Sequence, residues 1–136
     1  MSPKFLTHLL LTPLPDGRNW RVESPFAYAC AGGQVHFTVP TGFRTDLASI
    51  PRLFWNILPP FGKYTEAAVL HDWLYRTHLV SRPQADALLL EAMTLCRVPA
   101  WQRVVIYGAV RLFGWSAWHN EKRWEPRPAH VPVKHP

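Results

Sequence analysis

Apolar and polar residues are arranged differently in the two halves of this chain. In the first half, short segments alternate between polar and apolar positions and are separated by proline and glycine, as in strands joined by turns. We predict strands over Asn19–Glu23, Phe26–Cys30 and Gln34–Pro40, and either a strand or a short β-type arm over Lys4–Leu11. These segments predict a small antiparallel sheet or a set of hairpins, after which Gly42 permits a tight bend.

In the second half, apolar residues recur three and four positions apart, which indicates helices. Three helices are predicted: over about Tyr64–Val80, from Ser81 to a break at Val98–Pro99, and over about Trp101–Trp118. The second has a strong start signal, because Ser81 is a typical N-cap, Gln84 can close a capping box and Pro83 suits the first turn.

The helical apolar stripes give a candidate core. The second helix presents Ala85, Leu88, Leu89, Ala92, Met93 and Cys96 on one face, and the third presents Trp101, Val104, Val105, Gly108, Leu112 and Trp115. We expect the core of the helical half to include Leu70, Leu88, Leu89, Val105 and Leu112. The chain is therefore predicted to be an α+β protein, with an N-terminal antiparallel β portion packed on a C-terminal three-helix portion. We expect residues 1–120 to form one domain and the Pro-rich residues 121–136 to be an extended tail.

Composition narrows the class of protein. A chain of 136 residues with 48% hydrophobic content suits a single domain with a real core. The net charge is +6, but the sequence contains no arginine-rich run or zinc finger. We therefore predict no specific nucleic-acid binding. Neither a signal peptide nor a membrane span is evident, which predicts a non-transmembrane protein made in the cytoplasm. We interpret Cys30 and Cys96 as two apolar thiols, with a disulfide as the alternative.

The candidate chemistry centres on His71 and Asp72, which lie inside an apolar helical segment. A buried imidazole beside a buried carboxylate needs a partner. Tyr75 is four residues after His71 and shares its face, whereas Asp72 lies about 100° round the helix. If the next helix packs antiparallel, its Asp86 can approach His71. A carboxylate on one imidazole nitrogen fixes the tautomer and makes the other nitrogen a better base or ligand.

A divalent cation is a second hypothesis for the same residues. Asp72 and Asp46, the latter in the loop 42–52, would offer oxygen ligands to calcium, and the set Asp46, His71, Asp72 and Asp86 could instead hold zinc. Simpler interpretations stay open at this point. His71 could be a core histidine bonded to a carbonyl, Asp46 could cap a turn, and Asp86 could be a solvated first-turn acid.

Two resemblances add to these hypotheses. His71-Asp72-Trp73-Leu74-Tyr75, followed by Asp86 on a second helix, resembles the His-Asp-x-Cys-Tyr core of secreted phospholipase A2 enzymes. That resemblance implies His71 as the base that activates water, Asp72 as a calcium ligand, Asp86 as the partner of His71 and Tyr75 as a support. The flanking cysteines and the glycine-rich calcium loop of those enzymes are absent from this sequence.

The second resemblance covers residues 35 to 115. It rests on Gly-Phe-Arg-Thr-Asp-Leu-Ala-Ser-Ile-Pro-Arg at 42–52, Pro-Pro-Phe-Gly-Lys-Tyr at 59–64, Ala-Ala-Val-Leu-His-Asp-Trp-Leu-Tyr at 67–75 and Ser-Arg-x-x-Ala-Asp at 81–86. These segments look like a small uncharacterised domain family encoded mainly by tailed phages and prophages, often among tail or lysis genes. The resemblance implies a phage context and no particular reaction.

Together these inferences predict a virion or phage-tail hydrolase that acts on the host envelope, on peptidoglycan or a lipid ester, with His71, Asp86 and Tyr75 in its catalytic site. The alternative is a non-catalytic tail or baseplate component, in which the His/Asp cluster is a polar network or a metal clip. In both cases the expected partners are other tail proteins, and the host envelope is the expected target.

Overall fold

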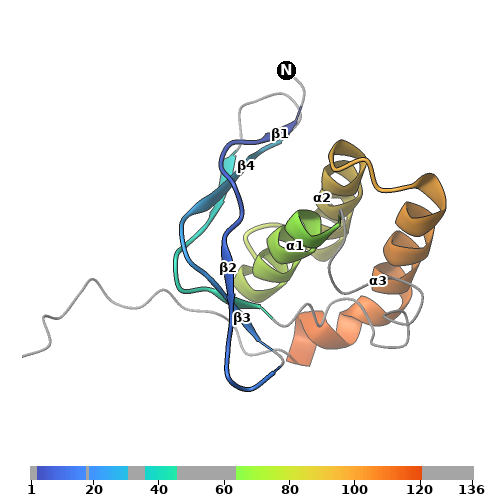
Figure 1. The fold of residues 1–136 in the computed structure, drawn as a ribbon. Helices are drawn as coiled ribbons and strands as arrows, with labels where there is room; N and C mark the ends of the chain where they lie inside the picture. Colours follow the sequence, from blue (N-terminus) through green and yellow to red (C-terminus); the bar gives the residue numbers. More distant parts are fainter. Residues whose placement is uncertain (1–2, 18, 31–35, 46–63, 121–136) are drawn as a thin grey trace, which may run out of the picture.

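The fold consists of short strands followed by three helices, as the sequence predicts. The computed structural model describes residues 3–17, 19–30, 36–45 and 64–120. Within these ranges, all six strands precede the helices along the chain, which makes an α+β arrangement (Figure 1). The predicted Pro-rich tail, residues 121–136, lies outside the described residues, so the domain limits stay a prediction.

The strands form two small antiparallel sheets. One sheet has the order β1-β4-β5 and contains Lys4–Phe5, Phe26–Ala29 and His36–Val39; the other has the order β2-β3-β6 and contains Leu11–Pro13, Trp20–Val22 and Arg44–Thr45. The segment Lys4–Leu11, predicted as a strand or a short β-type arm, is not one continuous strand. Its two ends pair with different partners, β4 and β3, so the chain passes from one sheet to the other between Phe5 and Leu11.

The helices are α1 (Thr65–Thr77), α2 (Arg82–Leu95) and α3 (Ala100–Asn120). The capping box of α2 is confirmed: the Ser81 side chain accepts the backbone N–H of Gln84, and the Gln84 side chain accepts the backbone N–H of Ser81. Helix α1 ends three residues before the predicted Val80. His78 adopts a left-handed φ of 53°, and its N–H donates to the carbonyl of Leu74, which closes the helix.

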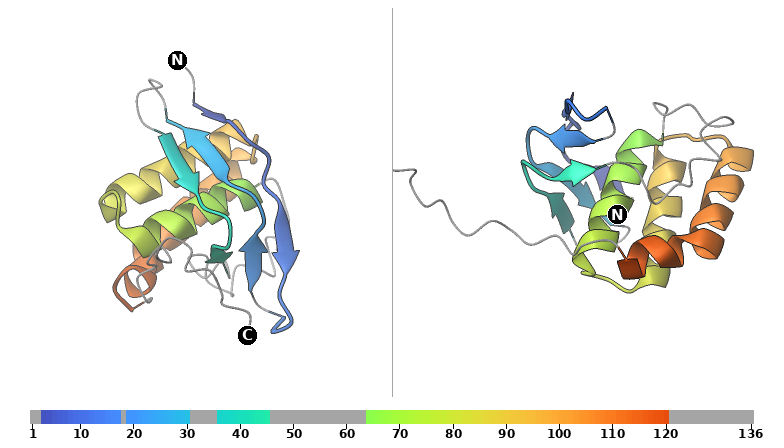
Figure 2. Two further views of the ribbon diagram at one scale, coloured as in Figure 1. Left: turned by 90° about the vertical axis from the view of Figure 1, so that its left-hand side faces the viewer. Right: turned by 90° about the horizontal axis from the view of Figure 1, so that it is seen from below.

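Helix α1 lies at the centre of the molecule. Every residue from Ala67 to Tyr75 is buried, which is possible only for a helix covered on all sides. Seen from below, the strands lie on one side of α1, and α2 and α3 lie on the other (Figure 2). Consecutive residues of α1 can therefore be buried against different layers, and this decides what His71 and Asp72 contact.

The core of the helical half differs from the prediction at α3. Leu70 and Leu89 are buried, and Leu88 and Val105 are partly buried, but Leu112 is 70% exposed, so its assignment to the core is wrong. The buried residues of α3 are Ile106, Ala109, Val110 and Gly114. Small residues on this face let α3 approach the other helices closely, whereas its Trp and Leu stripe is too bulky to do so.

Two sequence predictions concern features outside the core. None of the described helices is long and apolar enough to cross a membrane. Cys30 and Cys96 are partly buried free thiols, which agrees with their interpretation as apolar residues.

Candidate functional site

A buried histidine–carboxylate pair joins α1 to α2. The Nε2 atom of His71 lies 2.7 Å from Oδ1 of Asp86, and neither side chain is exposed to solvent. Helix α2 follows α1 after a short connection and packs against it, so the residues that sequence periodicity placed on facing sides do meet. The predicted contact between His71 and Asp86 is confirmed.

The Asp86 carboxylate is the centre of a polar network that involves all three helices. Its Oδ1 also accepts the hydroxyl of Tyr75 at 2.6 Å, and its Oδ2 accepts Nη1 of Arg111, on α3, at 2.8 Å. The rings of His71 and Tyr75 lie one turn apart on α1, with centroids separated by 4.2 Å. Three donors therefore hold one carboxylate, as a buried charge requires.

Arg82 supports this network from one turn before Asp86. Its Nε donates to the Tyr75 hydroxyl at 3.3 Å, and its Nη2 donates to the carbonyls of Val110 and Arg111 at 2.7 and 2.8 Å. One guanidinium thus ties the Tyr75 hydroxyl to the backbone of α3. The phenol is fixed between a cation that donates to it and a carboxylate to which it donates.

The protonation state of the network follows from burial and these hydrogen bonds. Burial lowers the pKa of His71 below its ordinary value of 6.5, against the opposing effect of Asp86. Burial acts to raise the pKa of Asp86, but the hydrogen bonds from His71, Tyr75 and Arg111 outweigh it and hold that pKa below 3.8. Burial raises the pKa of Tyr75. At neutral pH, Asp86 is therefore ionised and His71 is neutral.

These charge states fix the tautomer of His71. Because Asp86 is an ionised acceptor, the single ring proton of neutral His71 lies on Nε2 and is donated to it. Nδ1 then carries a free lone pair. This atom is buried and has no hydrogen-bond partner among the described residues. An oriented imidazole with one unprotonated nitrogen has the protonation state that a general base requires.

Asp72, the other acid of the motif, belongs to a separate cluster. Its Oδ2 accepts the hydroxyl of Thr45, on β6, at 2.6 Å, and its Oδ1 lies 3.4 Å from Nε of Arg76. The Arg76 guanidinium in turn lies 5.9 Å from the centre of the Phe43 ring. Asp72 therefore faces the strand layer, while His71 faces α2, as expected for neighbours about 100° apart on a helix.

Comparison with known protein families shows which family the chain belongs to. Residues 20–110 match the family model described as "Protein of unknown function (DUF1353)". The chain belongs to this family. The match includes every residue of the Asp86 network except Arg111, and it includes Asp72 and Thr45. No solved structure matches the chain.

One curated relative of this DUF1353 protein is "Uncharacterized protein y4jT" from Sinorhizobium fredii (strain NBRC 101917 / NGR234). The two are 34% identical over 97 residues, which are 70% of this chain and 29% of the relative. The chain thus spans less than a third of that relative's length.

The predicted cation site is not assembled by the described part of this DUF1353 protein. No group of three or more His, Cys, Asp or Glu side chains in that part could hold a metal ion. The charge of Asp72 already faces Arg76, which competes with a cation for the same carboxylate. Asp46, which the metal hypothesis requires, lies outside the described residues, so the hypothesis stays a prediction.

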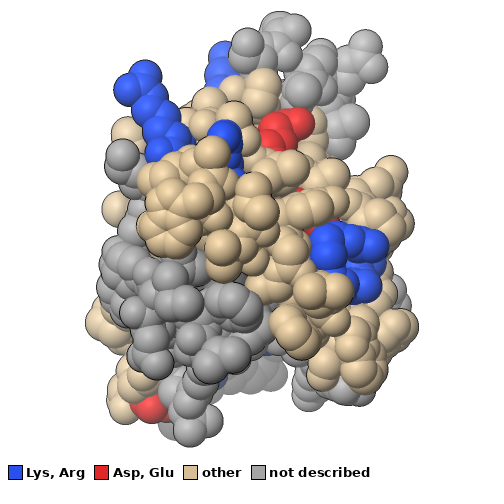
Figure 3. Space-filling model, turned by 90° about the vertical axis from the view of Figure 1, so that its right-hand side faces the viewer, with Lys and Arg blue, Asp and Glu red and all other residues tan. Residues whose placement is uncertain are grey.

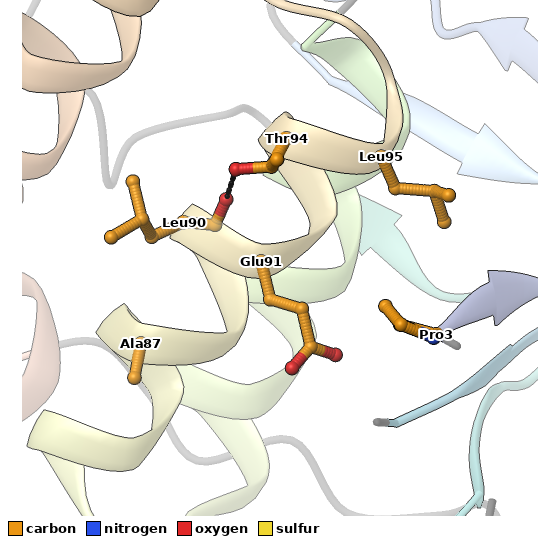
Figure 4. A pocket seen from close by; sticks show the side chains of 6 residues that line it. All are labelled: Pro3, Ala87, Leu90, Glu91, Thr94 and Leu95. Atoms are coloured by element: carbon orange, nitrogen blue, oxygen red, sulfur yellow. Dashed lines mark hydrogen bonds between the residues drawn. The ribbon is translucent and has the colours of Figure 1, made fainter. Parts of the chain in front are cut away.

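Two pockets that described residues line lie away from His71. One, of about 460 Å³, lies beside α2 and is lined by Pro3, Ala87, Leu90, Glu91, Thr94 and Leu95 (Figure 4). A second, of about 330 Å³, is lined by Cys30, Phe37, Val80, Gln84, Ala87, Leu88 and Glu91. No residue of the Asp86 network lines either pocket, and both pockets include Ala87 and Glu91 of α2.

The sequence prediction assigned no site role to four residues: Thr45, Arg82, Arg111 and Gly114. Arg82 had a usable signal, since it lies four residues before Asp86 and therefore on the same helix face. Arg111 and Thr45 gave no signal, because their contacts cross between elements far apart in the sequence.

Gly114 makes room for the network, and its replacement gives a direct test. A Cβ atom added there would lie 2.8 Å from the Tyr75 hydroxyl oxygen, so Gly114→Ala must displace the phenol from Asp86. We expect a loss of about 1–3 kcal/mol in the free energy of unfolding, measured by denaturant titration. Gly108→Ala is the matched control on the same helix, because nothing lies within 4 Å of its Cβ position. In the monomer it should stabilise the fold by about 0.5–1 kcal/mol. Equal effects of the two variants would contradict the packing argument.

Proposed function

We propose that this protein is a hydrolase in which His71 is the general base, and that it acts on the host envelope as part of a phage virion. The observation that supports the reaction class is the state of His71. Its Nε2 proton is held by Asp86, and the lone pair of Nδ1 has no partner among the described residues. A nitrogen in that state can take a proton from water.

The proposed step uses water and a carbonyl substrate. Nδ1 of His71 accepts one proton from water while the resulting hydroxide attacks the carbonyl carbon of an ester or amide. When the carbonyl–leaving-group bond breaks, the imidazolium returns that proton to the departing oxygen or nitrogen. Asp86 stabilises the imidazolium between these events. The sequence resemblance to phospholipase A2 supports the same assignment of His71, Asp86 and Tyr75. No step requires a cation at Asp72, which faces Arg76.

The envelope substrate and the virion context rest on the sequence. The segments at 42–52, 59–64, 67–75 and 81–86 resemble a domain of tailed phages, and hydrolysis of peptidoglycan or lipid is the chemistry by which such a particle enters or leaves a cell. The proposed partners are other tail proteins.

A second candidate is a non-catalytic tail or baseplate component. It is favoured by the completeness of the Asp86 network, in which one buried carboxylate receives three donors from two other helices. A satisfied buried network of this kind also specifies a unique packing of helices.

The test compares wild-type protein with His71→Gln on two substrates. Purified sacculi are assayed for release of soluble fragments, and phospholipid vesicles for release of fatty acid, each with calcium, zinc or a chelator. We expect wild-type protein to hydrolyse one of the two substrates and His71→Gln to be inactive on it while still folding cooperatively. Absence of wild-type hydrolysis under every condition would favour the structural component.

A further inference from the structure

The outer face of α3 is apolar and exposed. Trp101 and Trp115 are 55% and 56% exposed, and Val104 and Leu112 are each 70% exposed. Figure 3 views the side of the molecule on which α3 lies, and uncharged side chains cover much of the described surface there. Monomeric soluble proteins rarely leave such a stripe in water, because burying it is favourable. We therefore expect another surface to cover this stripe.

The order of residues in this stripe is symmetric about Gly108. Val104 and Leu112 lie four residues to either side of Gly108, and Trp101 and Trp115 lie seven residues to either side. Side-chain size increases from the glycine at the centre to the tryptophans at the ends. Helix α3 bends around the other helices (Figures 1 and 2), so larger residues toward its ends flatten the surface that it presents.

Among the described residues, nothing packs against the missing side chain of Gly108. No heavy atom of these residues lies within 4 Å of the position of its missing Cβ, whereas the Cβ of Gly114 would strike Tyr75. A glycine inside a helix costs about 1 kcal/mol relative to alanine. Close packing of another molecule against Gly108 would offset this cost, because a larger side chain there would prevent the contact.

We propose that this face is the interface of a symmetric dimer, in which α3 crosses α3 of a second copy antiparallel at Gly108. A twofold axis at Gly108 would place Trp101 against Trp115 of the second copy and Val104 against its Leu112. This is the reciprocal pairing that a self-complementary interface requires. A stripe that is symmetric in position and size satisfies it, whereas a bilayer surface or an unrelated partner would not require such symmetry.

The charges of α3 and the exposed apolar area of its outer face are both compatible with binding of a second copy of the chain. The two arginines of α3 are directed to α2, since Arg103 donates to Thr94 and Arg111 to Asp86, so like charges do not meet across the axis. The four apolar side chains expose on the order of 500 Å² per copy. Phe113, which is 56% exposed, adds to this area. A standard interface buries about 800 Å² per partner, so we expect a dimer that dissociates on dilution.

The first test measures mass in solution. Sedimentation equilibrium of the full chain over a wide concentration range should show a monomer–dimer equilibrium for wild-type protein. Leu112→Arg should be monomeric throughout, because it places two charges in the apolar contact. Thr38→Arg on β5 is the matched control, since Thr38 is exposed and far from the stripe in sequence, and it should dimerise like wild type. Thermal denaturation checks that both variants fold.

The second test measures whether the two copies of α3 cross in an antiparallel direction. In a background with Cys30 and Cys96 replaced by alanine, Val104→Cys and Leu112→Cys are treated with a mild oxidant, separately and as a mixture. An antiparallel pair should give a disulfide mainly in the mixture. Cross-linking of the separate variants as strong as that of the mixture would contradict the antiparallel crossing.

Three results would overturn the proposal. The first is a wild-type monomer at every concentration. The second is a monomer that binds anionic phospholipid vesicles and loses this binding in Leu112→Arg, which would make the face a lipid-docking surface. The third is a monomer that dimerises only after removal of residues 121–136, which would make the tail the occupant. None of these tests depends on hydrolytic activity, so the dimer and the proposed function can fail separately.

Discussion

Asp86→Ala should lower the free energy of unfolding by about 3–5 kcal/mol, the usual cost of removing one partner from a buried charged network. The substitution leaves three donors, on His71, Tyr75 and Arg111, without their common acceptor. Water cannot replace the carboxylate without entering a site in which Asp86 and His71 are fully buried. The measurement is a urea titration followed by circular dichroism, at a pH near 7.

A matched control separates this effect from the loss of any acidic side chain. Glu23 forms an exposed ion pair with Arg21, and solvent screening leaves a pair of that kind with little effect on stability. Glu23→Ala should therefore change the unfolding midpoint only slightly. If Asp86→Ala unfolds at the same urea concentration as Glu23→Ala, the network does not stabilise the packing of the three helices.

The sequence allowed prediction of those elements whose signals are local. The start of α2 was predictable because Ser81, Pro83 and Gln84 act within one turn. The contact between His71 and Asp86 was predictable because helix periodicity places both residues toward a shared interface. The division of the strands into two sheets was not, since pairing of β1 with β4 and of β2 with β3 depends on contacts between distant segments.

Helix α3 shows why an apolar stripe can mislead. This helix is apolar on two faces, and periodicity alone cannot tell which face the protein buries. The structure buries the face with Ala109, Val110 and Gly114, where α3 approaches Tyr75 and Arg82 closely, and exposes the face with Leu112 and Trp115. The error at Leu112 thus originates in the two-sided apolar character of α3, whose exposed side is the one that we propose for the dimer interface.

If the protein is the proposed hydrolase, His71→Gln and Asp86→Asn should each lower kcat/KM for its substrate by about 100- to 10,000-fold, the contribution of a positioned general base. A glutamine side chain cannot take over the role of His71, because its amide group is a far weaker base than imidazole. Asp86→Asn keeps the shape of the side chain but removes the negative charge that accepts the His71 proton. The imidazolium that forms during the reaction would then lose its stabilising partner, so His71 would be a weaker base.

Tyr75→Phe is the control for a purely structural effect. It removes one donor to Asp86 and the acceptor of Arg82, but it leaves the pair of His71 and Asp86 in place. We expect a measurable loss of stability with kcat/KM within about tenfold of wild type. If Tyr75→Phe and His71→Gln lose activity in parallel with stability, the network is structural and His71 is not the base.

The pH dependence of wild-type activity should show whether the activity falls as His71 becomes protonated. His71 acts as a base only when it is neutral, and burial holds its pKa below 6.5. As pH falls from about 8 toward 6.5, the imidazole stays neutral, so kcat/KM should stay constant; it should decline only at lower pH, as protons bind to Nδ1. An imidazole with an ordinary pKa would already be half protonated at pH 6.5 and would give half the maximal rate there. A midpoint at or above 6.5 for the acid limb, measured as kcat/KM across this range, would therefore exclude the buried, Asp86-bound His71 as the base.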